Sequence, residues 1–216
     1  MVKKPQLLVF CDNKSNNYNT ICSTGKTSLV LQLIRNRHEW FDKPSSRVIF
    51  LYNFLQPELV QLKREDPNVI LVDNLAEAKE LAIKDSLLVI DDKQQEMSQK
   101  SFLNEVIEIF IRGVRHNEFN CVLLVQSLFL DNLRVIMNNC NYLVLFNSPR
   151  NKQGINFLAK QISPNDWRYI VDAYRHACYD KPFCYLVFDF TMATPERWRL
   201  RSSIYPSKDT ILFSAS

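Results

Sequence analysis

The chain has 216 residues, a formal net charge of +4 and 46% hydrophobic residues, which is enough apolar surface for one sizeable core. No linker rich in Pro, Gly or Ser divides it, so we expect a single domain over residues 1–216. No segment approaches the length of a membrane span, and the N-terminal apolar run is too short for a secretory signal. We therefore expect a soluble, intracellular protein that makes no membrane contact.

Composition also narrows the kinds of site that the chain can carry. The six cysteines include no C-x-x-C pair and there is no histidine cluster, so we expect reduced thiols and no zinc site. The small positive charge is compatible with nucleic-acid contact but does not require it. Only three glycines are present, Gly25, Gly113 and Gly154, which makes a glycine directly before Lys26 more informative.

Strand-like and helix-like segments alternate along the chain. Short runs rich in Val, Ile, Leu and Phe predict buried strands, whereas apolar residues at helical spacing predict helices. The expected strands cover residues 6–11, 47–52, 69–72, 85–92, 121–126, 142–146 and, as the last strand, 184–190; the expected helices cover residues 28–40, 57–64, 76–84 and 101–114. This alternation predicts an α/β fold with a mostly parallel central sheet and helices on both faces.

The segment TICSTGKT, residues 20–27, lies after the first predicted strand and ahead of an apolar helix. It fits the phosphate-loop pattern G-x-x-x-x-G-K-[ST] except at the first glycine, which is Thr20 here. A β-branched residue at a position that often needs positive φ costs about 1–3 kcal/mol, so the loop is either strained or takes another path. The alternative is a chance Gly-Lys-Thr in a surface turn.

A phosphate loop binds a nucleoside triphosphate through backbone N–H groups and the positive end of the following helix. Lys26 would reach the β- and γ-phosphates, and the Thr27 hydroxyl would ligate Mg²⁺. The predicted cofactors are therefore ATP and Mg²⁺. The residues expected to bind the nucleotide are Cys22, Ser23, Thr24, Gly25, Lys26, Thr27 and Ser28.

A second motif, DSLLVIDD, is a buried-strand pattern that ends in Asp91 and Asp92. Ligands of open α/β sheets bind beyond the carboxyl ends of the strands, where the loop after the first strand also opens. Asp91 would then hold Mg²⁺ through water, and Asp92 would act as the base that orients and deprotonates the attacking water. The alternative is a strand that ends in a turn, with an aspartate capping a helix.

Gln126 ends the predicted strand CVLLVQ, which should bring its side chain to the same edge. There it could sense the γ-phosphate or position water. The alternative is a polar residue that only caps the following loop.

Several ordered blocks carry a family resemblance: VIFLYNFLQPEL from Val48, PNVILVDNL from Pro67, SLLVIDD from Ser86, RGVRHNEFNCVLLVQSLF from Arg112, NCNYLVLFNSPRNKQGINFLAKQI from Asn139 and TPERWRLRSSIYP from Thr194. In these blocks the chain resembles the genome-packaging ATPases of the FtsK/HerA superfamily, in particular those of poxviruses, Polinton-type elements and adintovirus-like viruses. The blocks cover most of residues 20–206.

The resemblance implies a three-layer P-loop NTPase fold of the RecA and FtsK/HerA type. It implies a homo-oligomeric ring that hydrolyses ATP to drive double-stranded DNA into a viral capsid or through its portal, at the virion assembly site or in the nucleus or cytoplasm of an infected cell. It assigns Gln126 to the sensor position. It also implies an arginine from the neighbouring subunit, for which the candidates are Arg115, Arg134 and Arg150, with Arg150 placed best because it follows a strand. For each arginine, the alternative is a surface role.

Two departures from the family pattern leave other functions open. The first glycine of the loop is Thr20, and the chain has Val125, Gln126, Ser127 where relatives often have Thr-Gln-Asn. A degenerate, non-catalytic P-loop protein is therefore one alternative; a small-molecule nucleotide kinase is another, although no arginine-bearing lid is evident. The basic clusters 112–116 and 197–201 are candidate DNA contacts, or else solvated faces or subunit contacts.

Overall fold

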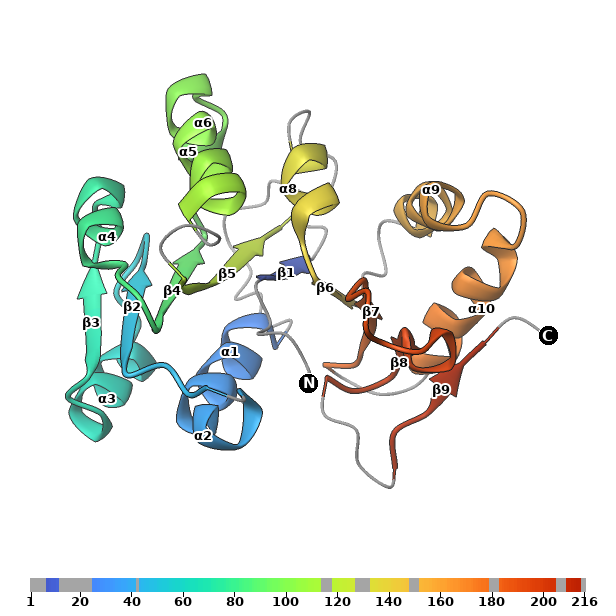
Figure 1. The fold of residues 1–216 in the computed structure, drawn as a ribbon, viewed down its shortest axis with the longest axis horizontal. Coiled ribbons are helices and arrows are strands. Elements are labelled where there is room, and N and C mark those ends of the chain that lie inside the picture. Colours follow the sequence, from blue (N-terminus) through green and yellow to red (C-terminus); the bar gives the residue numbers. More distant parts are fainter. Residues whose placement is uncertain are drawn as a thin grey trace.

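In the computed structural model the described residues are 7–11, 25–41, 43–113, 118–126, 133–147, 152–178, 183–204 and 209–214. Within them, the strands form one nine-stranded sheet in the order β3-β2-β4-β5-β1-β6-β7-β8-β9 (Figure 1). The strands are β1 (Leu7–Cys11), β2 (Arg47–Leu51), β3 (Val69–Val72), β4 (Ser86–Asp91), β5 (Asn120–Val125), β6 (Tyr142–Phe146), β7 (Tyr185–Asp189), β8 (Leu200–Arg201) and β9 (Leu212–Phe213).

The first six strands of the chain are parallel to one another, as the buried-strand patterns predicted. Side chains alternate between the two faces of the sheet, because successive residues of a strand point to opposite sides. On β4, for example, Leu88 and Ile90 belong to one buried cluster, and Leu87 and Val89 belong to the other. Both faces are therefore buried, which explains why the strands are apolar throughout.

Helices cover both faces of the sheet, so the predicted three-layer α/β arrangement is confirmed (Figure 1). One cluster contains residues of α1 (Lys26–Arg35) and α3 (Pro57–Glu65), with α2 (Arg37–Trp40) beside α1. The other contains residues of α4 (Leu75–Leu81), α5 (Gln94–Met97), α6 (Lys100–Glu108), η1 (Ile109–Gly113), α8 (Leu133–Asn139), α9 (Lys152–Ile162) and α10 (Trp167–Ala177).

The helix predicted over residues 28–40 is in fact two helices, because α1 ends at Arg35 and α2 begins at Arg37. Arg37 is buried at this junction, where its guanidinium donates to the carbonyls of Ile34 and Ser45 and forms an ion pair of 2.6 Å with Asp66. Likewise, the helix predicted over residues 101–114 ends in a π-helical turn, η1. In both segments the predicted apolar residues line one face of a helix. The first helix is interrupted, however, and the second changes to π-helical geometry.

The sheet continues past β6 with antiparallel strands, since β7 pairs antiparallel with β6, and β8 and β9 follow in the same way. The prediction that residues 184–190 form the last strand was therefore wrong. The added strands β8 and β9 have two residues each, which is too short for any alternating pattern to be visible in the sequence. A 3₁₀ turn, η2 (Glu196–Trp198), precedes β8.

Candidate nucleotide-binding site

The strand order brings the predicted motifs to one edge of the sheet. Strand β5 lies between β1 and β4 and is parallel to both, with Cys11 opposite Val125 and Asp91 opposite Leu124. The carboxyl ends of the three strands therefore lie at the same edge and almost level. Asp92 and Gln126 each follow directly after one of these ends.

Helix α1 begins at the same site, and Gly25 is its N-cap residue. Gly25 has φ +88°, a conformation that costs side-chain-bearing residues strain, and its carbonyl accepts the first helical hydrogen bond from Leu29, at 2.8 Å. A Cβ at this position would also lie 3.1 Å from the Cβ of Phe183 and 3.4 Å from Cε1 of Phe146. Both the backbone conformation and the close packing therefore require glycine before Lys26.

The side chains that follow Gly25 meet the acids at the end of β4. The Thr27 hydroxyl forms a hydrogen bond with the Asp91 carboxyl group, and the positive charge of Lys26 acts on the same carboxyl. The Gly-Lys-Thr motif and the twin acids thus converge on one place, at the positive end of a helix dipole. This arrangement is suited to bind an anion together with a cation.

Asp91 is buried, with 7% of its surface exposed. Burial raises its pKa, and the neighbouring Asp92 raises it further, to about 7, against the opposing effects of Lys26 and the Thr27 hydrogen bond. A carboxyl group that is buried and keeps its proton up to this pH would be stabilised in its charged form by a cation that replaces the proton. Because oxygen ligands are what Mg²⁺ prefers, a hydroxyl and a carboxyl in contact fit that ion.

Among the described residues, no group of three or more His, Cys, Asp or Glu side chains could hold a metal ion. Thr27 and Asp91 would supply oxygen ligands to a Mg²⁺ ion, which in proteins usually also keeps water and phosphate oxygens as ligands. The pair therefore fits Mg²⁺ that binds together with a nucleotide.

Asp92 and Gln126 are joined directly. The Gln126 amide Nε2 donates a hydrogen bond to Oδ1 of Asp92, and both residues are half-buried. Asp92 has φ +53°, so its backbone is in the left-handed region that non-glycine residues rarely adopt. Strain of this kind is concentrated at functional sites, where the surrounding structure holds it in place.

Lys93 was not predicted as part of the site. It is almost fully buried, and its Nζ donates to the carbonyl of Asp73 and to Oε1 of Glu96, both at 3.1 Å. These bonds connect the end of β4 to the segment after β3 and to α5, next to the strained Asp92. The sequence offered one signal, a lysine followed three residues later by a glutamate, but that spacing is common on exposed helices.

The other predicted residues do not contact Asp91 in any interaction that the structure describes, or they lie outside the described residues. Ser28 follows Thr27 in the first turn of α1 and is exposed, and Arg134 is exposed at the start of α8. Arg201, from the basic cluster 197–201, is buried and forms an ion pair of 3.0 Å with Asp189, so it is not available to DNA. The residues Thr20, Cys22, Ser23, Thr24, Arg115 and Arg150 lie outside the described residues.

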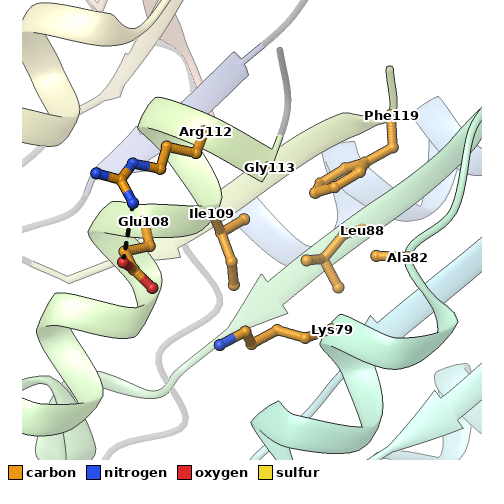
Figure 2. Close-up of a pocket in the computed structure, with 8 residues that line it drawn as sticks. All are labelled: Lys79, Ala82, Leu88, Glu108, Ile109, Arg112, Gly113 and Phe119. Carbon is orange, nitrogen blue, oxygen red and sulfur yellow. Dashed lines mark ion pairs between the residues drawn. The ribbon is translucent and has the colours of Figure 1, made fainter. Parts of the chain in front are cut away.

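A separate cavity of about 230 Å³ lies between α4 and η1, on the face of the sheet opposite to the face that α1 covers (Figure 2). Its lining combines the apolar side chains of Leu88, Ile109 and Phe119 with charged groups that are already paired. Lys79 binds Glu105 at 3.1 Å, and Arg112 lies 3.8 Å from Glu108. The cavity includes Arg112 of the basic cluster 112–116, but none of the residues predicted to bind the nucleotide or the metal.

A scan against protein-family models found no match, and neither did a search of curated proteins. Solved structures of similar fold do exist. The DNA-packaging ATPase B204 from Sulfolobus Turreted Icosahedral Virus aligns with a TM-score of 0.57 at 14% identity, over 88% of this chain and 95% of that chain. The genome packaging NTPase B204 from Sulfolobus turreted icosahedral virus 2, in complex with AMP, aligns with a TM-score of 0.57 at 14% identity. This alignment covers 97% of this chain and 96% of that chain.

At this level of identity the likeness shows the fold alone. The chain has the α/β fold of these NTPases, in agreement with the fold class that the sequence predicts. Across the part of the chain that the structure describes, no helix combines the length and apolar character needed to cross a membrane.

Proposed function

We propose that the protein binds ATP with Mg²⁺ at the N-terminus of α1 and hydrolyses it. The observation that carries this proposal is the meeting of Lys26 and Thr27 with the buried Asp91 at the carboxyl edge of the sheet. A chance Gly-Lys-Thr in a surface turn would have no reason to meet a buried carboxyl group whose pKa is raised. The B204 protein, which shares the fold, has been crystallised with ATP-gammaS and with AMPPCP.

Each residue has a distinct role in the proposed reaction. Lys26 binds the β- and γ-phosphates as a mobile positive charge, while Thr27 and Asp91 hold the metal. When bound, Mg²⁺ supplies positive charge that stabilises the phosphate oxygens in the transition state. Asp92 accepts the proton of the attacking water, and Gln126, through its hydrogen bond to Asp92, fixes the orientation of this carboxylate.

An arginine from a neighbouring copy would complete the site, as the family resemblance implies. Arg150 remains the first candidate, with Arg115 and Arg134 as the others. Of the three, Arg134 is the one that the structure describes, and its exposure on α8 leaves it accessible to a second copy. Its charge would stabilise the phosphoryl group during transfer.

We further propose that hydrolysis drives double-stranded DNA into a viral capsid, with the protein acting as a homo-oligomeric ring on a capsid or portal component at the site of virion assembly. The support is the family resemblance in the sequence blocks, together with the fold shared with a DNA-packaging ATPase. A motor of this kind contacts the phosphate backbone and reads no sequence, so binding should weaken steeply as salt rises.

The test is Mg²⁺-dependent ATP hydrolysis measured with and without duplex DNA. We expect DNA to stimulate turnover, and we expect Lys26→Ala to abolish it, because the phosphates lose their mobile positive charge. Lys100→Ala is the matched control, since Lys100 is an exposed lysine at the start of α6, on the other face of the sheet. Folded protein without DNA-stimulated turnover would contradict the motor function, and nucleotide binding without turnover would favour the non-catalytic alternative.

A further inference from the structure

The site has two different sides. On one side of β1 lie β5 and β4, which carry Gln126 and the acids; on the other side lie β6 and β7. Because β7 runs antiparallel to β6, with Tyr185 opposite Phe146, the residues just before β7 lie at the same edge as the carboxyl end of β1. This second side is aromatic, with Phe146, Phe183 and Tyr185.

Phe183 is the unusual member of this group. Its backbone has φ +62°, in the left-handed region where a bulky residue is a genuine outlier. The residue is 57% exposed, yet it also packs against Gly25, since a Cβ at Gly25 would lie 3.1 Å from the Cβ and 3.2 Å from Cδ1 of Phe183. The chain therefore accepts both backbone strain and an exposed apolar ring directly beside the start of α1.

The structure around Phe183 holds this ring in place. The backbone N–H of Asn147 donates to the carbonyl of Cys184 at 3.1 Å, which fixes the residue after Phe183 to the end of β6. Behind it, the rings of Phe146 and Tyr185 lie 5.3 Å apart, and the Tyr174 hydroxyl donates to the Phe146 carbonyl at 3.0 Å. The exposed ring thus has a rigid base.

We propose that the ring of Phe183 stacks on the purine base of the bound nucleotide. The inference rests on the proposed function, because it assumes that the phosphates lie at the N-terminus of α1. Lys26, Thr27 and the acids occupy the β5 side of that position and would surround the charged phosphates. The base, which is flat and largely apolar, then lies on the β6 side, where Phe183 presents an exposed aromatic surface next to Gly25.

A purely structural role for Phe183 makes a different prediction. If the ring only shields or supports the phosphate loop through Gly25, its removal should weaken the binding of every polyphosphate, with or without a base. If it stacks on the base, its removal should weaken the binding of ATP but leave inorganic tripolyphosphate unaffected. The two roles therefore separate in a comparison of these two ligands.

The experiment measures the affinities of Mg²⁺-ATP and Mg²⁺-tripolyphosphate by isothermal titration calorimetry. In Phe183→Ala we expect ATP affinity to fall about tenfold, with tripolyphosphate affinity within about twofold of the wild type, and in Phe183→Trp we expect ATP affinity to be retained because an aromatic ring remains. Phe157→Ala is the matched control, because Phe157 is also a phenylalanine with 55% exposure but lies on α9, which covers the other face of the sheet.

The possible failures are distinguishable. Wild-type protein that binds neither ligand would contradict the nucleotide site itself, and the stacking role with it. Wild-type protein that binds both, with Phe183→Ala weakening both equally or neither, would overturn the stacking role and leave the nucleotide site intact. A thermal unfolding curve for Phe183→Ala that matches the wild type would show that any loss of ATP affinity is not caused by misfolding.

Discussion

Two buried aspartates in this molecule have opposite surroundings. Asp189, in the antiparallel end of the sheet, binds the Arg201 guanidinium at 3.0 Å and also accepts hydrogen bonds from the Thr191 backbone and the Thr194 hydroxyl. Asp91, at the carboxyl edge of the parallel strands, lies beside a second carboxylate, and its pKa is raised to about 7. The first carboxylate is neutralised within the fold, whereas the second keeps a raised pKa, and the proposed magnesium site rests on this difference.

The comparison shows why burial of a charge does not by itself identify a functional site. Asp189 and Arg201 compensate each other, so this ion pair stabilises the junction of β7 and β8. At Asp91 the balance is left incomplete, because burial and Asp92 outweigh the effects of Lys26 and Thr27 on the pKa. An incompletely compensated carboxyl group at the N-terminus of a helix is the feature expected of a site that binds magnesium and phosphate together.

The largest effect is expected when the structural pair is broken. Arg201→Met would leave Asp189 buried without its ion-pair partner, so we expect the free energy of unfolding to fall by about 3–5 kcal/mol. Urea denaturation measures this change, and Arg197→Met, at an exposed arginine of the same cluster, should change it by no more than about 0.5 kcal/mol. Equal effects of the two variants would show that Arg201 is not structural and would return it to the candidate DNA contacts.

The second effect concerns Asp91, where we expect a substitution to raise the free energy of unfolding instead of lowering it. Its pKa in the folded protein is about 7, above the ordinary 3.8, so the folded state holds a proton that the unfolded state has lost between these values. Stability should therefore fall as pH rises from about 4 to about 7, by at most about 4 kcal/mol. Asp91→Asn has no proton to lose at this position, so we expect it to be more stable than the wild type above pH 7 and similar near pH 4.

Urea denaturation of the wild type and Asp91→Asn at pH 4 and pH 8 tests this prediction. The same variant should lose Mg²⁺-dependent hydrolysis, because an amide is a weaker metal ligand than a carboxylate. An Asp91→Asn protein that is less stable than the wild type at pH 8 would show that this carboxyl group is compensated in the same way as Asp189, and the contrast between the two would disappear.

The smallest effect is expected at Gln126. Its hydrogen bond to Asp92 positions a carboxylate without contacting the phosphates in the proposed mechanism. We therefore expect Gln126→Ala to reduce turnover about tenfold, with unchanged affinity for Mg²⁺-ATP. Steady-state kinetics combined with nucleotide binding separates these two quantities, and a loss of affinity without a loss of turnover would contradict a role in positioning Asp92.

Much of the parallel sheet could be predicted from the sequence, because each strand buried on both faces is a continuous apolar run. The meeting of Lys26 with Asp91 could also be predicted, since parallel strands open toward one edge whatever their order. Both predictions depend on local patterns combined with one rule of topology. They do not depend on which distant side chains form pairs.

The remaining features depend on such pairs. Arg201 looked like part of a surface basic cluster, and its partner, Asp189, is identified only once β7 and β8 are seen to be neighbours. Lys93 was missed because its burial depends on the carbonyl of Asp73, which belongs to another strand connection. Phe183 gave no signal at all, since positive φ is expected at glycine and not at phenylalanine.

The most direct test of the central claim is a crystal structure of the protein with Mg²⁺ and a non-hydrolysable ATP analogue. We predict that the β- and γ-phosphates lie at the N-terminus of α1 against Lys26, with the metal held by the Thr27 hydroxyl and by Asp91, directly or through water. An analogue bound in the cavity between α4 and η1, or phosphates remote from Asp91, would contradict it.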